Sequence, residues 1–420
     1  MNGRHHSSGL RRIKSVAADR LLAAPGREPA RRGATLDIDG GEIAAIEDAP
    51  REAEAGGPGC LVIPGLANAH DHGRGLRRLA YGAVDAPLEI WLPQLAATHP
   101  AVDPYVIHAV AFARMACAGV TAAVHCHVPQ TFDSLEEVEA VCRAARDVGI
   151  RLAFVVPLRD RGWIAYGGDE RFLEEAGGAD REAIRRQWAF APPPLEHQVA
   201  FVHAAADACE DAAIQVQLGP YGDAFVSRRL LEKAAEESAR SGRRLHMHCL
   251  ETRYQREWAD GEYEGEYLAW LDGIGFLSPR LTLAHGVWLR RGECELLADR
   301  GVTVSVNTSS NLRLRSGRAP VADFVAANLS FGFGLDGLAL DDDDDMLREL
   351  RLARLLHAGT GLDEALSNEL VFAGACAVGA RAATGRDDFG ELAPGRPADL
   401  VVLDYDAIAD DVLLDGLTPE

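Results

Sequence analysis

The chain has 420 residues, of which 47% are hydrophobic and 25% are charged, as is ordinary for a globular protein with a large core. Its formal net charge of −21 argues against nucleic acid and anionic membrane surfaces as partners, because like charges repel. No apolar run approaches the roughly 20 residues of a membrane span, and the N-terminus lacks the apolar segment of a secretion signal. The eight cysteines form no Cys-x-x-Cys pair, so we expect a cytoplasmic location.

Both ends of the chain have the pattern of short antiparallel strands. Residues 12–60 contain alternating stretches separated by two turn signals, DGGE at 39–42 and GGPG at 56–59. Residues 389–404 contain a Gly/Pro turn and then a strand-like run. We predict that both ends form one small β-sandwich domain. The chain stops soon after this run, so we expect the C-terminal part of that domain to be short.

Between Leu61 and His357, strand-like and helix-like segments alternate. Eight short apolar strands separated by amphipathic helices indicate the α/β class and a closed (β/α)8 barrel of the TIM type. An open doubly wound sheet usually has a Gly-rich phosphate turn after its first strand, which PGLANAHDHG is not. The predicted strands are 61–70, 120–128, 151–158, 213–219, 244–251, 281–288, 302–309 and 329–337, and the predicted helices include 103–118, 133–147, 197–209, 226–241 and 343–357. The predicted domains are 1–62 plus 385–420 for the β-domain and 63–384 for the barrel.

Histidines and acidic residues occupy the C-terminal ends of several predicted barrel strands, where this fold places its functional groups. On the first strand, His70 and His72 are two residues apart and therefore project to the same side. A lone histidine in a strand is more often a hydrogen-bonded core residue, and an Asp between glycines is usually a turn residue. The ordered set nevertheless predicts a metal centre. Its further members are His125 and His127 on the second strand, His246, His248 and Glu251 on the fifth, His285 on the sixth and Asp336 on the eighth.

Six motifs occur in one order along the chain: PGLANAHDH, LHMHCLET, LAHGVWL, SVNTSSNLRL, FGLDG and ELAPGRPADLVVLD. Together they resemble the amidohydrolase superfamily, most closely its cytosine deaminase and triazine hydrolase (chlorohydrolase-like) branch. The resemblance covers nearly the whole chain. It implies that the metal ligands are His70, His72, His248 and Asp336. It also implies that His285 contacts the attacking water and the substrate.

The lysines of the chain limit the number of metals. Lys14 and Lys233 are the only two, and neither ends the fourth predicted strand. Binuclear members of the superfamily bridge two metals with a carboxylated lysine there, where this chain has QVQLGPYG. We therefore predict one divalent metal; three imidazoles and a carboxylate suit zinc, with iron as the alternative.

The ligand types predict hydrolytic chemistry. The metal lowers the pKa of a bound water, Asp336 accepts its proton, and His285 stabilises the charge that develops. Glu251 protonates a ring nitrogen of the substrate and then the leaving amine. Ammonia leaves only when protonated, whereas chloride does not need a proton. We therefore predict a metal-dependent deaminase of an amino-substituted nitrogen heterocycle. The alternatives are a hydrolase of the same fold that cleaves C–Cl or cyclic amide C–N bonds, and a catalytically silent scaffold.

The segment WLPQL, at 91–95, follows the first strand in what we expect to be a loop. The superfamily branch often places an aromatic residue here against the substrate. Trp91 and Gln94 are therefore the predicted substrate contacts, and Leu92 and Leu95 are expected to pack.

Three further side chains are candidates for the substrate pocket. His125 and His127 either hydrogen-bond a heterocycle or form a packed polar layer of the barrel. Arg159 follows the third strand and binds a carboxylate or carbonyl oxygen, or else lies on the surface. Bacterial cytosine deaminases carry a glutamine near this point, which PLRDRG lacks, so cytosine itself is not the expected substrate.

The run Asp341–Asp345 precedes a predicted helix. We interpret it as a helix-capping segment in preference to a metal-binding cluster, because Asp is favoured at caps and in first turns. The expected partner of the protein is a small heterocyclic molecule, with neither nucleic acid nor membrane. The oligomeric state stays open, a homo-oligomer included.

Overall fold

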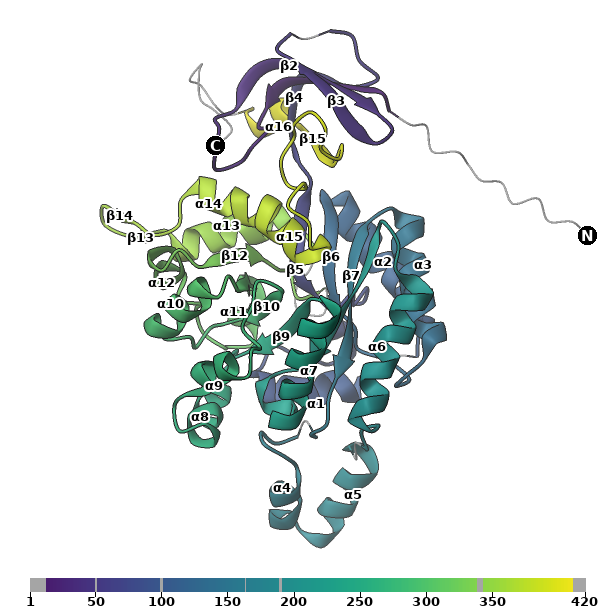
Figure 1. Ribbon diagram of the computed structural model, residues 1–420, viewed down its shortest axis with the longest axis vertical. Helices are drawn as coiled ribbons and strands as arrows, with labels where there is room; N and C mark the ends of the chain where they lie inside the picture. Colours follow the sequence, from purple (N-terminus) through teal and green to yellow (C-terminus); the bar gives the residue numbers. More distant parts are fainter. Residues whose placement is uncertain are drawn as a thin grey trace, which may run out of the picture. The chain divides into compact units, whose positions relative to one another are not determined.

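The computed structural model describes residues 13–49, 51–98, 101–162, 164–188, 191–337 and 343–410. By its internal contacts the chain divides into two compact units, residues 1–65 with 388–420, and residues 66–387. The ribbon in Figure 1 labels the elements of both units.

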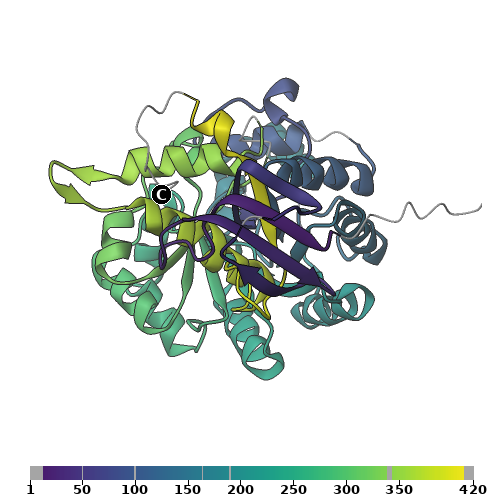
Figure 2. The same cartoon turned by 90° about the horizontal axis from the view of Figure 1, so that it is seen from above.

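Eight parallel strands form the barrel of the second unit, and helices surround them (Figure 2). Each strand pairs with the next one along the chain. Where the barrel closes, between its last and first strands, the backbone N–H of Asp336 donates to the His70 carbonyl at 3.0 Å. The predicted (β/α)8 fold is confirmed. The strands are β5 (Leu66–Asp71), β6 (Val120–Cys126), β7 (Arg151–Leu158), β8 (Ile214–Pro220), β9 (Leu245–Cys249), β10 (Leu281–His285), β11 (Thr303–Val306) and β12 (Ser330–Phe333).

The five helices predicted by residue range are all present. They begin at side-chain caps where the sequence offers them: the Ser134 hydroxyl accepts from the Glu137 N–H, and Ser227 accepts from Leu230. Among the described residues, no helix has the length and apolar character needed to cross a membrane. These five helices are α2 (Pro104–Cys117), α3 (Leu135–Val148), α6 (Leu195–Cys209), α7 (Arg228–Ser241) and α13 (Met346–His357).

The barrel unit contains further short elements on and between these helices. Before β8 come η1 (Arg78–Tyr81), α1 (Leu88–Ala97), α4 (Glu170–Glu175) and α5 (Gly178–Trp188). After β8 come η2 (Asp223–Phe225), α8 (Arg253–Glu262), α9 (Tyr267–Gly273), α10 (Arg291–Asp299), α11 (Thr308–Arg313), α12 (Val321–Ala326), the hairpin β13 (Gly359–Thr360) and β14 (Asp363–Glu364), α14 (Asn368–Ala373), the π-helical η3 (Gly374–Val378) and α15 (Gly379–Thr384).

The described part of the first unit is one mixed sheet with strands from both chain ends, in the order β15-β4-β1-β2-β3. Its buried side is apolar and includes Val16, Leu36, Ile43 and Val62. The predicted DGGE turn joins β2 to β3 through two glycines, Gly40 and Gly41, with φ of +61° and +91°. The elements are β1 (Ser15–Leu21), β2 (Arg31–Asp39), β3 (Glu42–Glu47), β4 (Ala55–Pro64), β15 (Leu400–Asp404) and α16 (Tyr405–Ile408).

Two local predictions near the first barrel strand are wrong. The single strand expected over 61–70 is two strands of different sheets, β4 and β5, separated at Gly65. The GGPG segment is not a turn but part of β4, where a Cβ on Gly56 would lie 2.0 Å from the Ala17 carbonyl oxygen. Glycine is needed at this point because the neighbouring backbone approaches too closely for a side chain.

The WLPQL segment is not a loop either, since it lies inside α1. The helix contains Pro93, which lacks a backbone N–H donor. The helix continues past it nevertheless, and the Thr98 N–H donates to the Gln94 carbonyl at 3.1 Å.

The closing point of the barrel leaves no space for a side chain at Gly334. A Cβ there would lie 2.4 Å from Asn307 Oδ1 and 2.8 Å from the His70 carbonyl oxygen. We expect Gly334→Ala to lower the free energy of unfolding by about 1–3 kcal/mol, as overpacking does, measured by urea denaturation. The control is Gly261→Ala in α8, where a Cβ meets nothing within 4 Å. An unchanged midpoint for Gly334→Ala would contradict this account of the closure.

Candidate metal centre and active site

Four side chains meet at the C-terminal ends of β5 and β9 and just beyond β12. The Nε2 atoms of His70 and His72 each lie 3.3 Å from Asp336 Oδ1. His72 Nε2 also lies 3.2 Å from His248 Nε2. Ligands held tetrahedrally at about 2.0–2.1 Å from one ion are about 3.3–3.4 Å apart. The spacing of these atoms is therefore that of the ligands of a single divalent metal.

Each of the three histidines uses its other ring nitrogen in a hydrogen bond. His72 Nδ1 donates to the Cys126 carbonyl at 2.8 Å, and His248 Nδ1 donates to the Tyr221 carbonyl at 2.7 Å. His70 Nδ1 lies 2.9 Å from His246 Nε2, one layer deeper in the barrel. With Nδ1 carrying the proton, each Nε2 has a free lone pair for a metal. Within the described part of the chain, His70 Nε2 is a buried atom without a hydrogen-bond partner.

The carboxylate of Asp336 is oriented from its other side. Oδ2 accepts a hydrogen bond from the Ser310 hydroxyl at 2.6 Å, which leaves Oδ1 facing the histidines. Burial alone would raise the pKa of Asp336, but the neighbouring imidazoles of His70, His72 and His285 hold it well below the usual range. The carboxylate is therefore ionised and suited to bind a cation.

His285, at the end of β10, faces the same centre but does not share its tight spacing. Its Nδ1 lies 3.0 Å from Asn311 Oδ1 and 3.2 Å from Asn307 Nδ2, so two amides orient the ring. Its Nε2 lies 3.7 Å from Glu251 Oε2. The backbone φ of His285 is +72° and that of Asp336 is +62°. This conformation is uncommon for non-glycine residues and occurs where a side chain must be aimed.

Glu251 is a buried carboxyl that is held by its backbone. Its N–H donates to Gln255 Oε1 at 2.6 Å, and the preceding Leu250 N–H donates to Asp223 Oδ2 at 2.7 Å. Burial raises the pKa of Glu251 to about 7, and the neighbouring charge of Asp336 acts in the same direction, whereas His285 opposes it. Such a carboxyl can carry a proton near neutral pH and release it.

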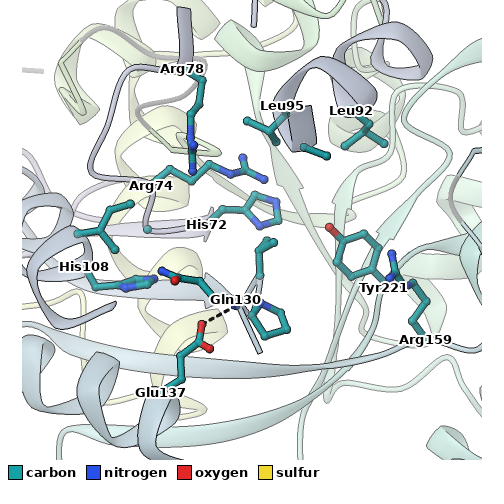
Figure 3. A pocket seen from close by; sticks show the side chains of 15 residues that line it. His72, Arg74, Arg78, Leu92, Leu95, His108, Gln130, Glu137, Arg159 and Tyr221 are labelled. Carbon is teal, nitrogen blue, oxygen red and sulfur yellow. Dashed lines mark hydrogen bonds between the residues drawn. The ribbon is translucent and has the colours of Figure 1, made fainter. Parts of the chain in front are cut away.

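Two cavities with shared walls open at this centre. The smaller is lined by Trp91, Glu251, His285 and Asp336 among others. The larger has a volume of about 350 Å³ and reaches from His72 to Arg159 (Figure 3). Both are also lined by Arg74, Leu92 and Tyr221.

Some of the predicted substrate contacts line these cavities and others do not. Trp91 lines the smaller one beside Glu251, and Arg159 lines the larger one with its guanidinium carbon 5.5 Å from the centre of the Tyr221 ring. Gln94 lies on α1 but lines neither cavity. Leu92 and Leu95, which we expected only to pack, form part of the wall of the larger cavity, because the helical turn presents them on one side.

His125 and His127 belong to a second histidine group, behind the cavity wall. His125 Nε2 lies 3.2 Å from His127 Nδ1, and His127 Nε2 lies 3.3 Å from the Glu137 carboxylate. His125 is fully buried and lines neither of the two cavities. Of the two readings offered by the sequence, the geometry favours the packed polar layer for this pair.

Two other sequence features have structural roles away from the metal centre. Asp345 caps α13 by accepting from the Leu347 and Arg348 N–H groups, and Asp343 pairs with Arg348 at 2.7 Å. Asp341 and Asp342 lie outside the described residues. Asp71 accepts from the Gly73 N–H at 2.6 Å, and this hydrogen bond fixes the turn that contains the candidate ligand His72.

The residues lining the larger cavity that sequence reasoning missed include Arg74, Arg78 and Tyr221. Arg74 lies beyond the end of β5, after Gly73 with a φ of +59°, so the alternation of His70 and His72 does not extend to it. Arg78 lies on η1 and Tyr221 follows β8, and no sequence pattern points to either.

A (β/α)8 barrel with three histidines and an aspartate at its strand ends defines a class of metal-dependent hydrolases. The chain belongs to the amidohydrolase family, because the model of that family matches residues 61–418. A divalent-metal site at the histidine-rich centre agrees with this membership.

Curated relatives of the chain are deaminases. It is 29% identical over 352 residues to an 8-oxoguanine deaminase of Pseudomonas aeruginosa, covering 83% of this chain and 75% of the relative. It is 30% identical over 381 residues to a 5'-deoxyadenosine deaminase of Methanosarcina acetivorans, covering 89% and 80%.

Solved structures with this fold include a triazine hydrolase variant, with a TM-score of 0.80 and 25% identity over 94% of this chain and 87% of the other. Another is an atrazine chlorohydrolase from Arthrobacter aurescens complexed with zinc, with a TM-score of 0.78 and 25% identity over 96% and 89%.

The second hydrogen-bond layer predicts an effect on metal affinity. We expect His246→Phe to weaken zinc binding about 10- to 100-fold, because His70 Nδ1 loses the acceptor 2.9 Å away. Zinc affinity is measured by competition with a chromogenic chelator. The control is His197→Phe on α6, an exposed histidine outside the centre. Equal affinity in both variants would show that His246 does not support the metal ligands.

Buried histidines also predict acid sensitivity of the metal-free protein. Burial lowers the pKa of seven of them, so the unfolded chain, titrating near 6.5, binds more protons than the folded one. The histidine contribution to the free energy of unfolding is therefore highest above pH 6.5. It decreases as the pH falls below 6.5, by up to about 1.4 kcal/mol per histidine and per pH unit. The raised pKa values of Asp71, Asp223 and Glu251 act in the opposite sense but are fewer. The seven are His70, His72, His108, His125, His246, His248 and His357.

The measurement is urea denaturation in the presence of a chelator at pH 7.5, 6.5 and 5.5. A free energy of unfolding that stays constant over this range would contradict the predicted proton uptake.

Proposed function

We propose that the protein is a hydrolytic deaminase, which replaces the exocyclic amino group of a nitrogen heterocycle by oxygen and releases ammonia. The observation that carries the proposal is Glu251, a buried carboxyl beside the metal centre whose pKa is raised to about 7. Hydrolytic removal of an amine requires a group that gives up a proton to the leaving nitrogen. The deaminase names of the relatives point in the same direction.

The proposed cofactor is one zinc ion, held by His70, His72, His248 and Asp336. The donor set fits zinc because it consists of three imidazoles with free Nε2 atoms and one ionised carboxylate at tetrahedral spacing. A single ion is proposed because β8 ends in Gly219 and Pro220 and offers no lysine for a second one. Iron is the alternative.

When bound, the divalent metal supplies Lewis-acid chemistry and lowers the pKa of water. Asp336 Oδ1 is placed to accept a proton from the attacking water. Glu251 holds a proton that it delivers to a ring nitrogen. It then takes up a proton from the newly added hydroxyl group and passes it to the amine, which leaves as ammonia; the proton accepted by Asp336 restores Glu251. The Nε2 of His285 faces the position between them and stabilises charge that develops on oxygen. Trp91 provides an apolar wall for the ring of the substrate, and Arg159 a polar contact.

A second candidate is a hydrolase that releases chloride. The similarity to triazine hydrolase and atrazine chlorohydrolase favours it. This reaction does not require Glu251 to protonate the leaving group, because chloride leaves without a proton. The expected setting in both cases is cytoplasmic, with a small heterocycle as the expected partner.

The test is metal analysis followed by a screen for released ammonia with purines, pterins, pyrimidines and triazines, and for released chloride with chlorotriazines. We expect about one zinc per chain and ammonia from at least one aminated ring. Bound zinc with chloride but no ammonia would favour the second candidate. A chain without affinity for zinc would contradict both.

The role of Glu251 is tested by Glu251→Gln, which retains the shape of the side chain but cannot transfer a proton. We expect a loss of kcat of about 10²- to 10⁴-fold with unchanged zinc content. In the unmodified enzyme, kcat for ammonia release should fall as the pH rises through about 7, since Glu251 then loses its proton. Glu257→Gln, at an exposed glutamate of α8, is the control. Full ammonia release by Glu251→Gln would rule out the proton transfer.

A further inference from the structure

The larger cavity beside the metal centre is rich in arginine. Arg74, Arg78 and Arg159 line it, and Glu137 is its single acidic lining residue. The chain as a whole carries a net charge of −21. A positive cavity in such an acidic protein is a local feature that the overall composition does not explain.

The acidic residue of the cavity does not neutralise these arginines. Glu137 accepts hydrogen bonds from the Gln130 and Thr131 N–H groups at 2.8 and 3.1 Å and pairs with His127. His108, also in the wall, adds no charge, because burial lowers its pKa to about 4. The positive charge of the cavity therefore comes from arginine alone.

Two of the arginines are buried close to each other. Arg74 is 8% exposed and Arg78 is 2% exposed, and Figure 3 shows them on the same wall, above His72. Burial and the charge of Arg74 lower the pKa of Arg78 to about 10. Within the part of the chain that is described, no carboxylate lies at ion-pair distance from Arg74; its guanidinium carbon lies 5.6 Å from the centre of the Trp91 ring. Buried charges of one sign are stabilised when an anion lies between them.

Part of the cavity wall is apolar, and the cavity is continuous with the candidate metal centre. Leu92, Leu95 and Ile107 line one part of it, and His72 belongs both to this wall and to the candidate metal ligands. A molecule whose ring lies at the metal centre can therefore extend a substituent toward Arg74 and Arg78. Guanidinium groups bind carboxylate and phosphate oxygens in paired hydrogen bonds.

We infer that this cavity is a binding site for an oxyanion, and that the substrate is a heterocycle with a carboxylate or phosphate substituent held by Arg74 and Arg78, with Arg159 on the opposite side. This inference rests on the proposed function for the identity of the ring. The arginine site itself can be tested without turnover.

The experiment compares matched ligands that differ in the anionic group. For the carboxylate, the pair is 2-aminopyrimidine-5-carboxylate and its carboxamide; for the phosphate, it is adenosine 5'-monophosphate and adenosine. Affinity for the zinc-loaded protein is measured by titration calorimetry. We expect the anionic member of one pair to bind about 10- to 100-fold more tightly than the neutral one, the range for hydrogen bonds to charged groups. The pair that shows the preference identifies the oxyanion.

Arginine variants locate the effect. Arg78→Met should remove most of the preference by weakening the binding of the anionic member, and Arg74→Met should do the same. The matched control is Arg77→Met, since Arg77 is the exposed neighbour of Arg78 and does not line the cavity. Melting temperature and zinc content show whether each variant is folded.

The inference is overturned if neither pair shows a preference, if the preference survives in Arg78→Met and Arg74→Met, as it would for an anion bound to zinc, or if Arg77→Met has the same effect. Arginine-dependent binding without ammonia release would support the oxyanion site and count against the proposed deamination. Ammonia release from neutral rings that is insensitive to the arginines would do the reverse.

Discussion

The hydrogen bond from the Asp336 N–H to the His70 carbonyl joins the end of the barrel to its beginning, and the site depends on it. The same two residues supply the first and last candidate metal ligands in the chain, with Asp336 Oδ1 3.3 Å from His70 Nε2. Closing the barrel therefore forms the metal centre in the same step. The absence of a side chain at Gly334 is part of this constraint, because the closing segment lies directly against His70.

Burial and neighbouring charges set the protonation states of the histidines and carboxyl groups around this point. Burial lowers the pKa of His70, His72 and His248, which keeps them neutral as metal binding requires, and backbone carbonyls select the tautomer of His72 and His248. Two carboxyls in the same region differ in proton affinity. Asp336 faces histidine nitrogens and is ionised, whereas Glu251 has few groups to stabilise its charge and retains a proton to about pH 7. An acid and a base can thus operate side by side at one pH.

The sequence was sufficient for the fold and for the grouping of His70, His72, His248, Glu251, His285 and Asp336, because alternation along strands is local and parallel strands end at one edge of a barrel. Its errors occur where tertiary contacts override a local signal. The GGPG segment contains strong turn residues, yet Gly56 is required by the close approach of Ala17. The WLPQL segment was expected to be a loop, yet it lies inside α1. Arg78 and Tyr221 reach the cavity from separate loops, and their meeting depends on three-dimensional folding that no spacing encodes.

The charge of the whole chain and the charge of its cavity are separate constraints. Acidic side chains on the surface are screened by salt within about 10 Å, so a net charge of −21 has little influence at the bottom of a cavity. Buried guanidinium groups are screened far less, and the mutual repulsion of Arg74 and Arg78 is retained. Two such groups are stable next to each other only if other interactions of the fold, such as the Arg78 bond to the Thr98 carbonyl, compensate for the repulsion. The repulsion between these two arginines therefore lowers the stability of the fold next to the candidate hydrolytic centre. The same two charges are what would let the cavity select an anionic ligand over a neutral one.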